Sequence, residues 1–167
     1  MMTKSLGFAL SLSMAATGAA QALSCLPSTV QDVYHDAANA KEVYTILVGK
    51  LSFDRSKLPI VDMARQDQSP PNTDIPAQFS GRGMRANGWS NSVKDRPITL
   101  RVQCLAAWCG GMANDVEYLM FAEQVAQNKW QLTVGPCGGF AFAEPTKKML
   151  GDLRKCMRGQ ECPKTNF

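Results

Sequence analysis

The chain has 167 residues, of which 45% are hydrophobic and 19% are charged, and its formal net charge is +4. This charge balance is too mild to indicate a nucleic-acid partner. The length suits one domain with its own hydrophobic core. Beyond the N-terminal region, no segment is long and apolar enough to cross a membrane.

Residues 1–22 have the pattern of a secretory signal peptide. Lys4 gives a positive start, an uncharged apolar run follows, and Ala20-Gln21-Ala22 is an A-x-A cleavage site. We therefore expect a mature chain that begins at Leu23 and forms a single domain over residues 23–167. That chain is expected in the periplasm or outside the cell, where a protein rarely meets nucleic acid.

Two other interpretations of the N-terminal segment are weaker. A transmembrane helix needs about 20 apolar residues, and this run is shorter and ends in a cleavage signal. A lipoprotein would carry its lipid on Cys25, but Ala22 stands where such a signal has a leucine. The secreted form is the preferred prediction.

Six cysteines lie in the mature chain, at positions 25, 104, 109, 137, 156 and 162. An even number in an exported chain predicts three disulfides. Zinc sites and thiol-redox sites use C-x-x-C pairs, whereas the close spacings here are C-x4-C and C-x5-C. The single histidine, His35, lies off the apolar stripe of its helix and is expected at the solvated surface. We expect no metal and no cofactor.

The elements are predicted in chain order from apolar periodicity. A helix begins near Pro27, with Ser28 as its cap and Gln31 completing a capping box. Gly49 suggests a bulge or bend in the first strand, and Pro76 and the weak pattern suggest that the second is an edge strand. The five strands are expected over residues 42–53, 75–84, 98–104, 117–126 and 129–134.

The remaining segments are loops and a second helix. Residues 54–74 are polar and proline-rich, which predicts a long loop. Glu144-Pro145 begins a closing helix with an apolar stripe. That stripe consists of Met149, Leu150, Leu153, Cys156 and Met157. Five strands flanked by two helices predict a mainly β fold, a five-stranded OB-like Greek-key barrel with N-terminal and C-terminal helices, stapled by disulfides.

Several short motifs resemble those of the netrin-like, tissue-inhibitor-of-metalloproteinase-like domains of secreted proteins, including bacterial ones. These motifs cover most of the mature chain. They are Ser24-Cys25-Leu26-Pro27, Val48-Gly49-Lys50, Trp108-Cys109-Gly110, Tyr118-Leu-Met-Phe-Ala122 and Cys137-Gly-Gly. The resemblance implies an OB fold and a binding ridge around the N-terminal disulfide.

The chain departs from the family at its first cysteine, where Leu23 stands. The resemblance implies that Cys25 pairs with Cys137. Cys104 then closes a local loop with Cys109, and Cys156 and Cys162 staple the C-terminal tail to the closing helix. In the metalloproteinase inhibitors the amine and carbonyl of the first cysteine chelate the protease zinc. Leu23 lacks the disulfide that holds that amine in place, so inhibition of a metalloprotease is not the main expectation.

The sequence contains no recognised catalytic motif. There is no G-x-S-x-G nucleophile elbow, and the glycine-rich stretch at 81–88 lacks the Lys-Ser/Thr of a phosphate loop. The basic residues Arg82, Arg85, Lys94, Arg96 and Arg101 form either a patch for an acidic partner or a solvated strand face. The solvated face is preferred. Trp108 is expected to be a core plug beside a disulfide rather than an exposed anchor.

We therefore expect an exported, non-enzymatic binding module that contacts an unknown exported protein, as a protease inhibitor does, or a small ligand. The candidate binding residues are Leu23, Ser24, Leu26, Trp108 and Gly110. One alternative is a periplasmic enzyme or thiol-redox protein with an unrecognised site. Another is a structural component of the cell envelope.

Overall fold

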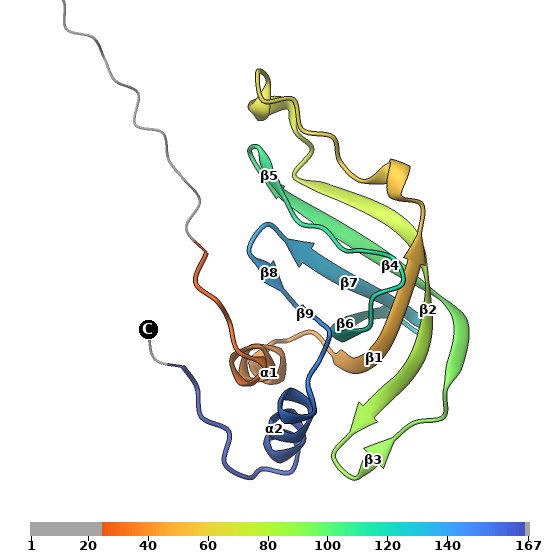
Figure 1. The fold of residues 1–167 in the computed structure, drawn as a ribbon, viewed down its shortest axis with the longest axis vertical. Helices are drawn as coiled ribbons and strands as arrows, with labels where there is room; N and C mark the ends of the chain where they lie inside the picture. Colours follow the sequence, from red (N-terminus) through yellow and green to blue (C-terminus); the bar gives the residue numbers. More distant parts are fainter. Residues whose placement is uncertain (1–24, 166–167) are drawn as a thin grey trace, which may run out of the picture.

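Five strands close into a barrel in the computed structural model, which describes residues 25–165 (Figure 1). They follow one another around the barrel in the order β1 (Tyr44–Phe53), β2 (Asn72–Arg85), β4 (Val93–Leu105), β7 (Lys129–Gly135) and β6 (Tyr118–Ala126). β6 returns to β1, and β4 and β7 are the one parallel pair in this ring. This is the predicted OB-like Greek-key barrel. The predicted signal peptide, Leu23 and Ser24 lie outside the described residues.

Two helices lie side by side on the outside of the barrel, α1 (Val30–Asn39) and α2 (Lys147–Met157) (Figure 1). The other elements are short. They are the 3₁₀ turns η1 (Arg55–Lys57) and η2 (Gln66–Gln68), and the strands β3 (Gly88–Trp89), β5 (Trp108–Cys109), β8 (Gly138–Gly139) and β9 (Ala141–Ala143).

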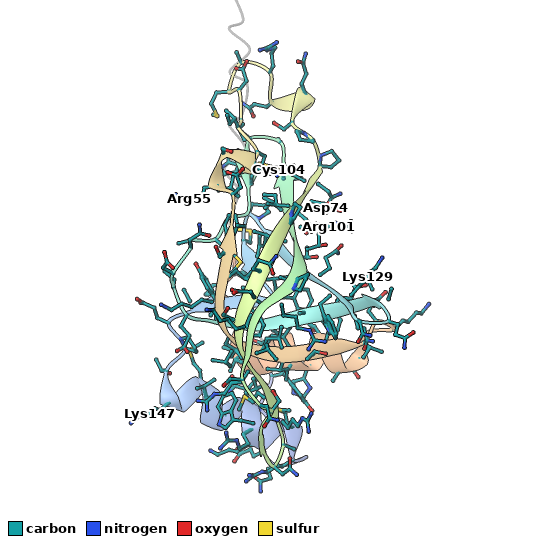
Figure 2. The ribbon with its side chains drawn as sticks, turned by 90° about the vertical axis from the view of Figure 1, so that its right-hand side faces the viewer. Arg55, Asp74, Arg101, Cys104, Lys129 and Lys147 are labelled. Atoms are coloured by element: carbon teal, nitrogen blue, oxygen red, sulfur yellow. A yellow bond between two sulfur atoms is a disulfide. The ribbon has the colours of Figure 1, made fainter. Side chains whose placement is uncertain are left out.

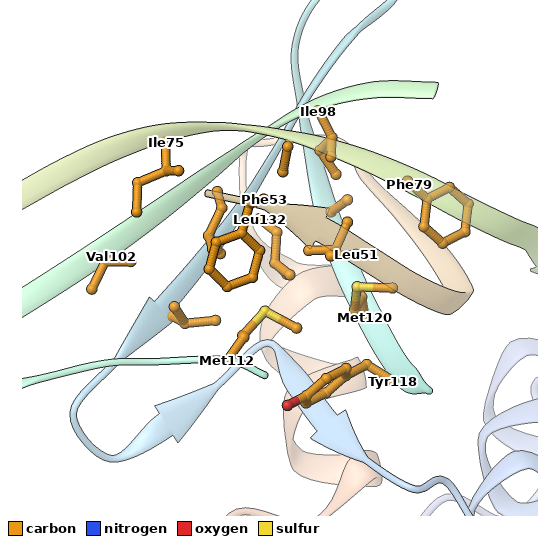
Figure 3. Packing of buried hydrophobic residues seen from close by; sticks show 14 residues of the cluster. Leu51, Phe53, Ile75, Phe79, Ile98, Val102, Met112, Tyr118, Met120 and Leu132 are labelled. Atoms are coloured by element: carbon orange, nitrogen blue, oxygen red, sulfur yellow. The ribbon is translucent and has the colours of Figure 1, made fainter. Parts of the chain in front are cut away.

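The buried residues form two clusters on opposite faces of the same strands. Leu51, Phe53 and Met120 point into the barrel with the large side chains of β2, β4 and β7 (Figure 3). Leu119 and Phe121 point outward, against the stripes of α1 and α2. Because both of its faces are covered, β6 begins as a continuous apolar run rather than an alternating one.

The prediction that β2 is an edge strand is wrong. β2 pairs with β1 on one side and with β4 on the other. Pro76 is tolerated because the β1 pairing ends at Phe53 and Ala77, so Pro76 lies just beyond it. Both β2 and β4 are longer than predicted, since their exposed polar ends pair through the backbone and have no apolar alternation to reveal them.

Of the bulge or bend suggested at Gly49, the bulge is absent. The register between β1 and β2 runs without a shift from Leu47 to Phe53. Gly49 lies opposite Gly81, and the two backbones approach so closely that neither position has room for a Cβ atom. The irregularity falls instead on β2 between Phe79 and Gly81, in its pairing with β4.

The three expected disulfides, Cys25–Cys137, Cys104–Cys109 and Cys156–Cys162, are all present. No free cysteine occurs among the described residues. Three disulfides are consistent with an oxidising, exported location.

The cap of α1 lies one residue later than predicted. Thr29, not Ser28, is the cap, and Asp32, not Gln31, completes the capping box. His35 is also less exposed than expected, because its Nε2 donates a hydrogen bond to the carbonyl oxygen of Cys162 at 2.8 Å. The C-terminal tail therefore lies across the first helix.

Asp32 joins the start of α1 to this tail. Its carboxylate accepts hydrogen bonds from the Thr29 amide, the Thr29 hydroxyl and the Thr165 amide at 2.6–2.9 Å. Burial raises the pKa of Asp32, but these hydrogen bonds outweigh burial and leave the pKa well below its ordinary value. The charged carboxylate is therefore the form that stabilises the fold.

We expect Asp32→Asn to lower the free energy of unfolding by about 1–2 kcal/mol at neutral pH. The pKa of an aspartate in the unfolded chain is about 3.9. The extra stability of the wild type over the variant is therefore fully present above that pH and is lost as the pH falls below it. Urea unfolding at a series of pH values measures the difference. Asp36→Asn, an exposed change on the same helix, is the control and should differ little from wild type. A deficit of Asp32→Asn that is unchanged in acid would contradict this role.

Candidate functional site

A disulfide-closed hairpin projects from the end of β4. Cys104 faces Cys109 across the two strands, and Leu105 faces Trp108. Directly opposed residues point to the same face of a hairpin, and successive residues point to opposite faces. The disulfide therefore lies on one face, while the Leu105 and Trp108 side chains share the other.

The expectation that Trp108 is a core plug is wrong. Its side chain is 41% exposed and Leu105 is 59% exposed, and neither belongs to the two buried clusters. The hairpin lies beyond the last barrel pairings of β4, at Val102 and Gln103, so its apolar face is outside the barrel interior. The sequence reasoning missed Leu105, although its position next to Cys104 in a C-x4-C loop was a usable signal.

The turn of this hairpin holds a strained residue. Ala106 has a φ of 52°, in the left-handed region that costs a residue with a Cβ atom about 1–2 kcal/mol. A two-residue hairpin loop normally carries Asn or Gly there. Strain of this kind persists where the surroundings impose it and often accompanies binding segments. Here the adjacent disulfide holds the turn.

Two further segments reach the same end of the barrel. Gly110 packs so closely on the carbonyl of Val134 that an added Cβ would lie 2.2 Å from it, which gives Gly110 a packing role. Cys137, two residues after Gly135, forms a disulfide with Cys25. This bond holds the N-terminal segment at the same end of the barrel. Leu26, which follows Cys25, is 65% exposed.

The loop between β1 and β2 adds a fourth segment. The carbonyl of Pro71 accepts a hydrogen bond from the Cys104 amide, which fixes the end of this loop beside the hairpin. Ile60 and Met63 on the loop are 92% and 67% exposed. Figures 1 and 2 show the loop extending past the hairpin at this end of the molecule. These two residues were also missed, because the loop was judged by its polar composition.

We call the exposed side chains of Leu26, Ile60, Met63, Leu105 and Trp108 the apolar ridge. Within residues 25–165, seven large hydrophobic side chains are exposed, and five of them belong to this ridge. Single exposed apolar residues are ordinary. Several of them on segments that meet at one end of the barrel make that end a candidate interaction surface.

Three of the five basic residues contact other side chains of the protein. Arg101 donates two hydrogen bonds of 2.7 Å to Asp74 on the neighbouring strand, which lowers the pKa of that carboxyl (Figure 2). Arg82 and Arg96 lie over the rings of Trp89 and Trp130, at 4.1 and 3.8 Å from the ring centres. These internal partners agree with the preferred solvated strand face.

No group of three His, Cys, Asp or Glu side chains within residues 25–165 could hold a metal ion. No helix in the same range is long and apolar enough to span a membrane. No protein-family model, curated protein or solved structure matches the chain. The functional assignment therefore rests on the geometry of the apolar ridge.

Proposed function

We propose that the protein is an exported, non-enzymatic binding module that docks a partner protein on the apolar ridge. The observation that carries the proposal is the hairpin with Leu105 and Trp108 exposed side by side and closed by Cys104–Cys109. A partly exposed tryptophan is the residue type most often found as an interface anchor. A pre-formed loop also loses little conformational entropy on binding.

The resemblance to netrin-like domains supports the same location. Members of that family bind through a ridge beside the N-terminal disulfide, and here Cys25–Cys137 lies beside the hairpin end of the barrel. Protease inhibition is the narrower form of the proposal, and Leu23 in place of the first cysteine argues for a contact that does not depend on zinc chelation. The ridge is apolar, so the expected partner surface is an apolar pocket or groove.

A photo-crosslinking amino acid at Ala107, in the protein exported by its native cell, tests the proposal. We expect one adduct of defined mass from position 107 and none from position Lys147 on α2, which lies far from the ridge (Figure 2). After the partner is purified, Trp108→Ala should weaken its binding about thirtyfold, the effect of losing about 2 kcal/mol. Thermal unfolding of Trp108→Ala should match wild type, since the ring is outside both cores.

Equal adducts at both positions, or full affinity of Trp108→Ala, would contradict docking on the ridge. If docking on the ridge is supported, the identity of the crosslinked partner tests whether the module is a protease inhibitor. A protease whose activity falls in the complex would make the module an inhibitor. A partner without such activity would make it an adaptor.

A further inference from the structure

A cavity of about 340 Å³ opens at the end of the barrel away from the apolar ridge. Its walls come from the first residues of β1, the second half of β2 and the first residues of β4, together with Ser90, Trp130 near the start of β7 and Met157 at the end of α2. The hairpin lies at the other end of β4. This hollow, which we call the barrel mouth, is therefore separate from the proposed docking surface and does not depend on it.

The barrel mouth exists because two strands part there. The pairing of β1 with β2 stops at Leu47 and Gly83, yet β1 extends back to Tyr44 and β2 continues to Arg85. On the other side of β2, the register with β4 shifts between Phe79 and Gly81. The splayed strands leave a space that no side chain fills. Its volume is within the range of small-molecule sites, which often occupy the mouths of β-barrels.

The lining changes character from the inside to the rim. Phe79 and Ile98, which also belong to the barrel core, are 2% and 6% exposed (Figure 3). Arg85 and Arg96 are exposed at the rim. The lining includes no carboxylate, so the charge at the opening is positive. An apolar interior with a cationic rim matches a ligand that has an apolar body and an anionic head.

The two arginines are free to take an anion. Neither forms an ion pair with another residue in the described part of the chain. The Arg96 guanidinium lies over Trp130, which orients it while leaving its edge N–H groups to donate. Among the lining residues, Tyr44 lies near two carboxylates. Burial raises the pKa of its hydroxyl, and the negative charges of Glu123 and Glu42 raise it further. Tyr44 itself stacks on Phe140.

Trp130 supplies a second observation. Its Nε1 is buried and has no hydrogen-bond acceptor among the described residues. A buried donor without an acceptor costs about 1–3 kcal/mol, and a ligand oxygen would satisfy it. Trp130 also borders a second, more open hollow beside Lys129.

We propose that the barrel mouth binds a small amphipathic monocarboxylate, with its chain against Phe79 and Ile98 and its carboxylate at the rim arginines. A liquid-water molecule occupies about 30 Å³, so the cavity has room for about ten non-hydrogen atoms. Octanoate has this size. A single charge suits the site better than a phosphate dianion, because the apolar wall makes desolvation of a second charge costly.

Titration calorimetry of the full exported protein with octanoate tests the proposal, with octanol and octylammonium as probes of equal length. We expect octanoate to bind at least about tenfold more tightly than either, since a charge-assisted hydrogen bond contributes about that factor. Arg96→Gln and Arg85→Gln should each weaken octanoate binding by about three- to tenfold or more. Trp130→Phe keeps an aromatic ring and removes the donor, and should weaken it by about threefold.

Lys129→Gln is the matched control, because it removes a positive charge from the second hollow. It should leave octanoate affinity unchanged. The proposal would be overturned if octanol bound as tightly as octanoate. It would also be overturned if Lys129→Gln lost octanoate binding while Arg85→Gln kept it. If Arg96→Gln fails to fold, Arg85→Gln decides, since that side chain has no aromatic or ionic partner among the described residues.

Discussion

Replacing Cys25 and Cys137 together by serine is expected to lower the free energy of unfolding by about 4–5 kcal/mol. This disulfide joins residues 112 positions apart, and in the chain-entropy model a closed loop of that length restricts the unfolded chain by this amount. It also attaches the N-terminal segment covalently to the turn between β7 and β8. Urea unfolding under oxidising conditions measures the loss.

The Cys156–Cys162 disulfide provides the matched comparison. Its residues are six positions apart, so the double serine variant should lose only about 2 kcal/mol. Equal losses in the two variants would mean that native contacts of the cysteines, and not loop length, set their contribution. In that case the long-range disulfide would not be the main covalent support of the barrel.

Gly49→Ala is expected to destabilise the barrel by about 3 kcal/mol or more. An added Cβ at this position would lie 2.2 Å from the carbonyl oxygen of Ser80 and 2.7 Å from the Cα of Gly81. Both atoms belong to the backbone of the neighbouring strand, so no side chain can rotate away and β1 and β2 must separate. Overpacking of this kind ordinarily costs about 1–3 kcal/mol, and a backbone obstacle in a closed barrel raises it.

Two other glycines test this explanation by chemical denaturation. At Gly83, in the same strand pair, an added Cβ would meet the Ser90 hydroxyl at 3.2 Å, and that side chain can move. At Gly151 on α2 it would meet nothing within 4 Å, and alanine should stabilise the helix by up to about 1 kcal/mol. A cost for Gly49→Ala no larger than that for Gly83→Ala would show that the strands part without difficulty.

Much of the architecture could be predicted from local pattern. The alternation at Ile98–Cys104 predicted a strand, and the spacing of Leu153 and Cys156 predicted the buried stripe of α2. These patterns are readable because each element buries one face and exposes the other. The pattern of apolar residues predicted the five strands and two helices. The family resemblance implied the Cys25–Cys137 disulfide, and the short spacings of the remaining cysteines suggested the two local ones.

The candidate site was only partly predictable. Trp108 was singled out, but its exposure depends on how far the hairpin projects, which the C-x4-C spacing does not specify. Ile60 and Met63 lie in a loop whose polar composition concealed them. The barrel mouth has no sequence signature, because it arises from the place where β1 and β2 stop pairing.

The amino-acid sequence by itself therefore determined which segments are strands and helices and which of their faces are apolar, since these depend on neighbours within a few residues. The tertiary structure decided which strand each segment meets. It placed Gly49 against Gly81, gave β2 a partner on both sides, and brought Thr165 to Asp32. These contacts join residues far apart in the chain, and backbone hydrogen bonding and steric fit, which local periodicity does not report, select them.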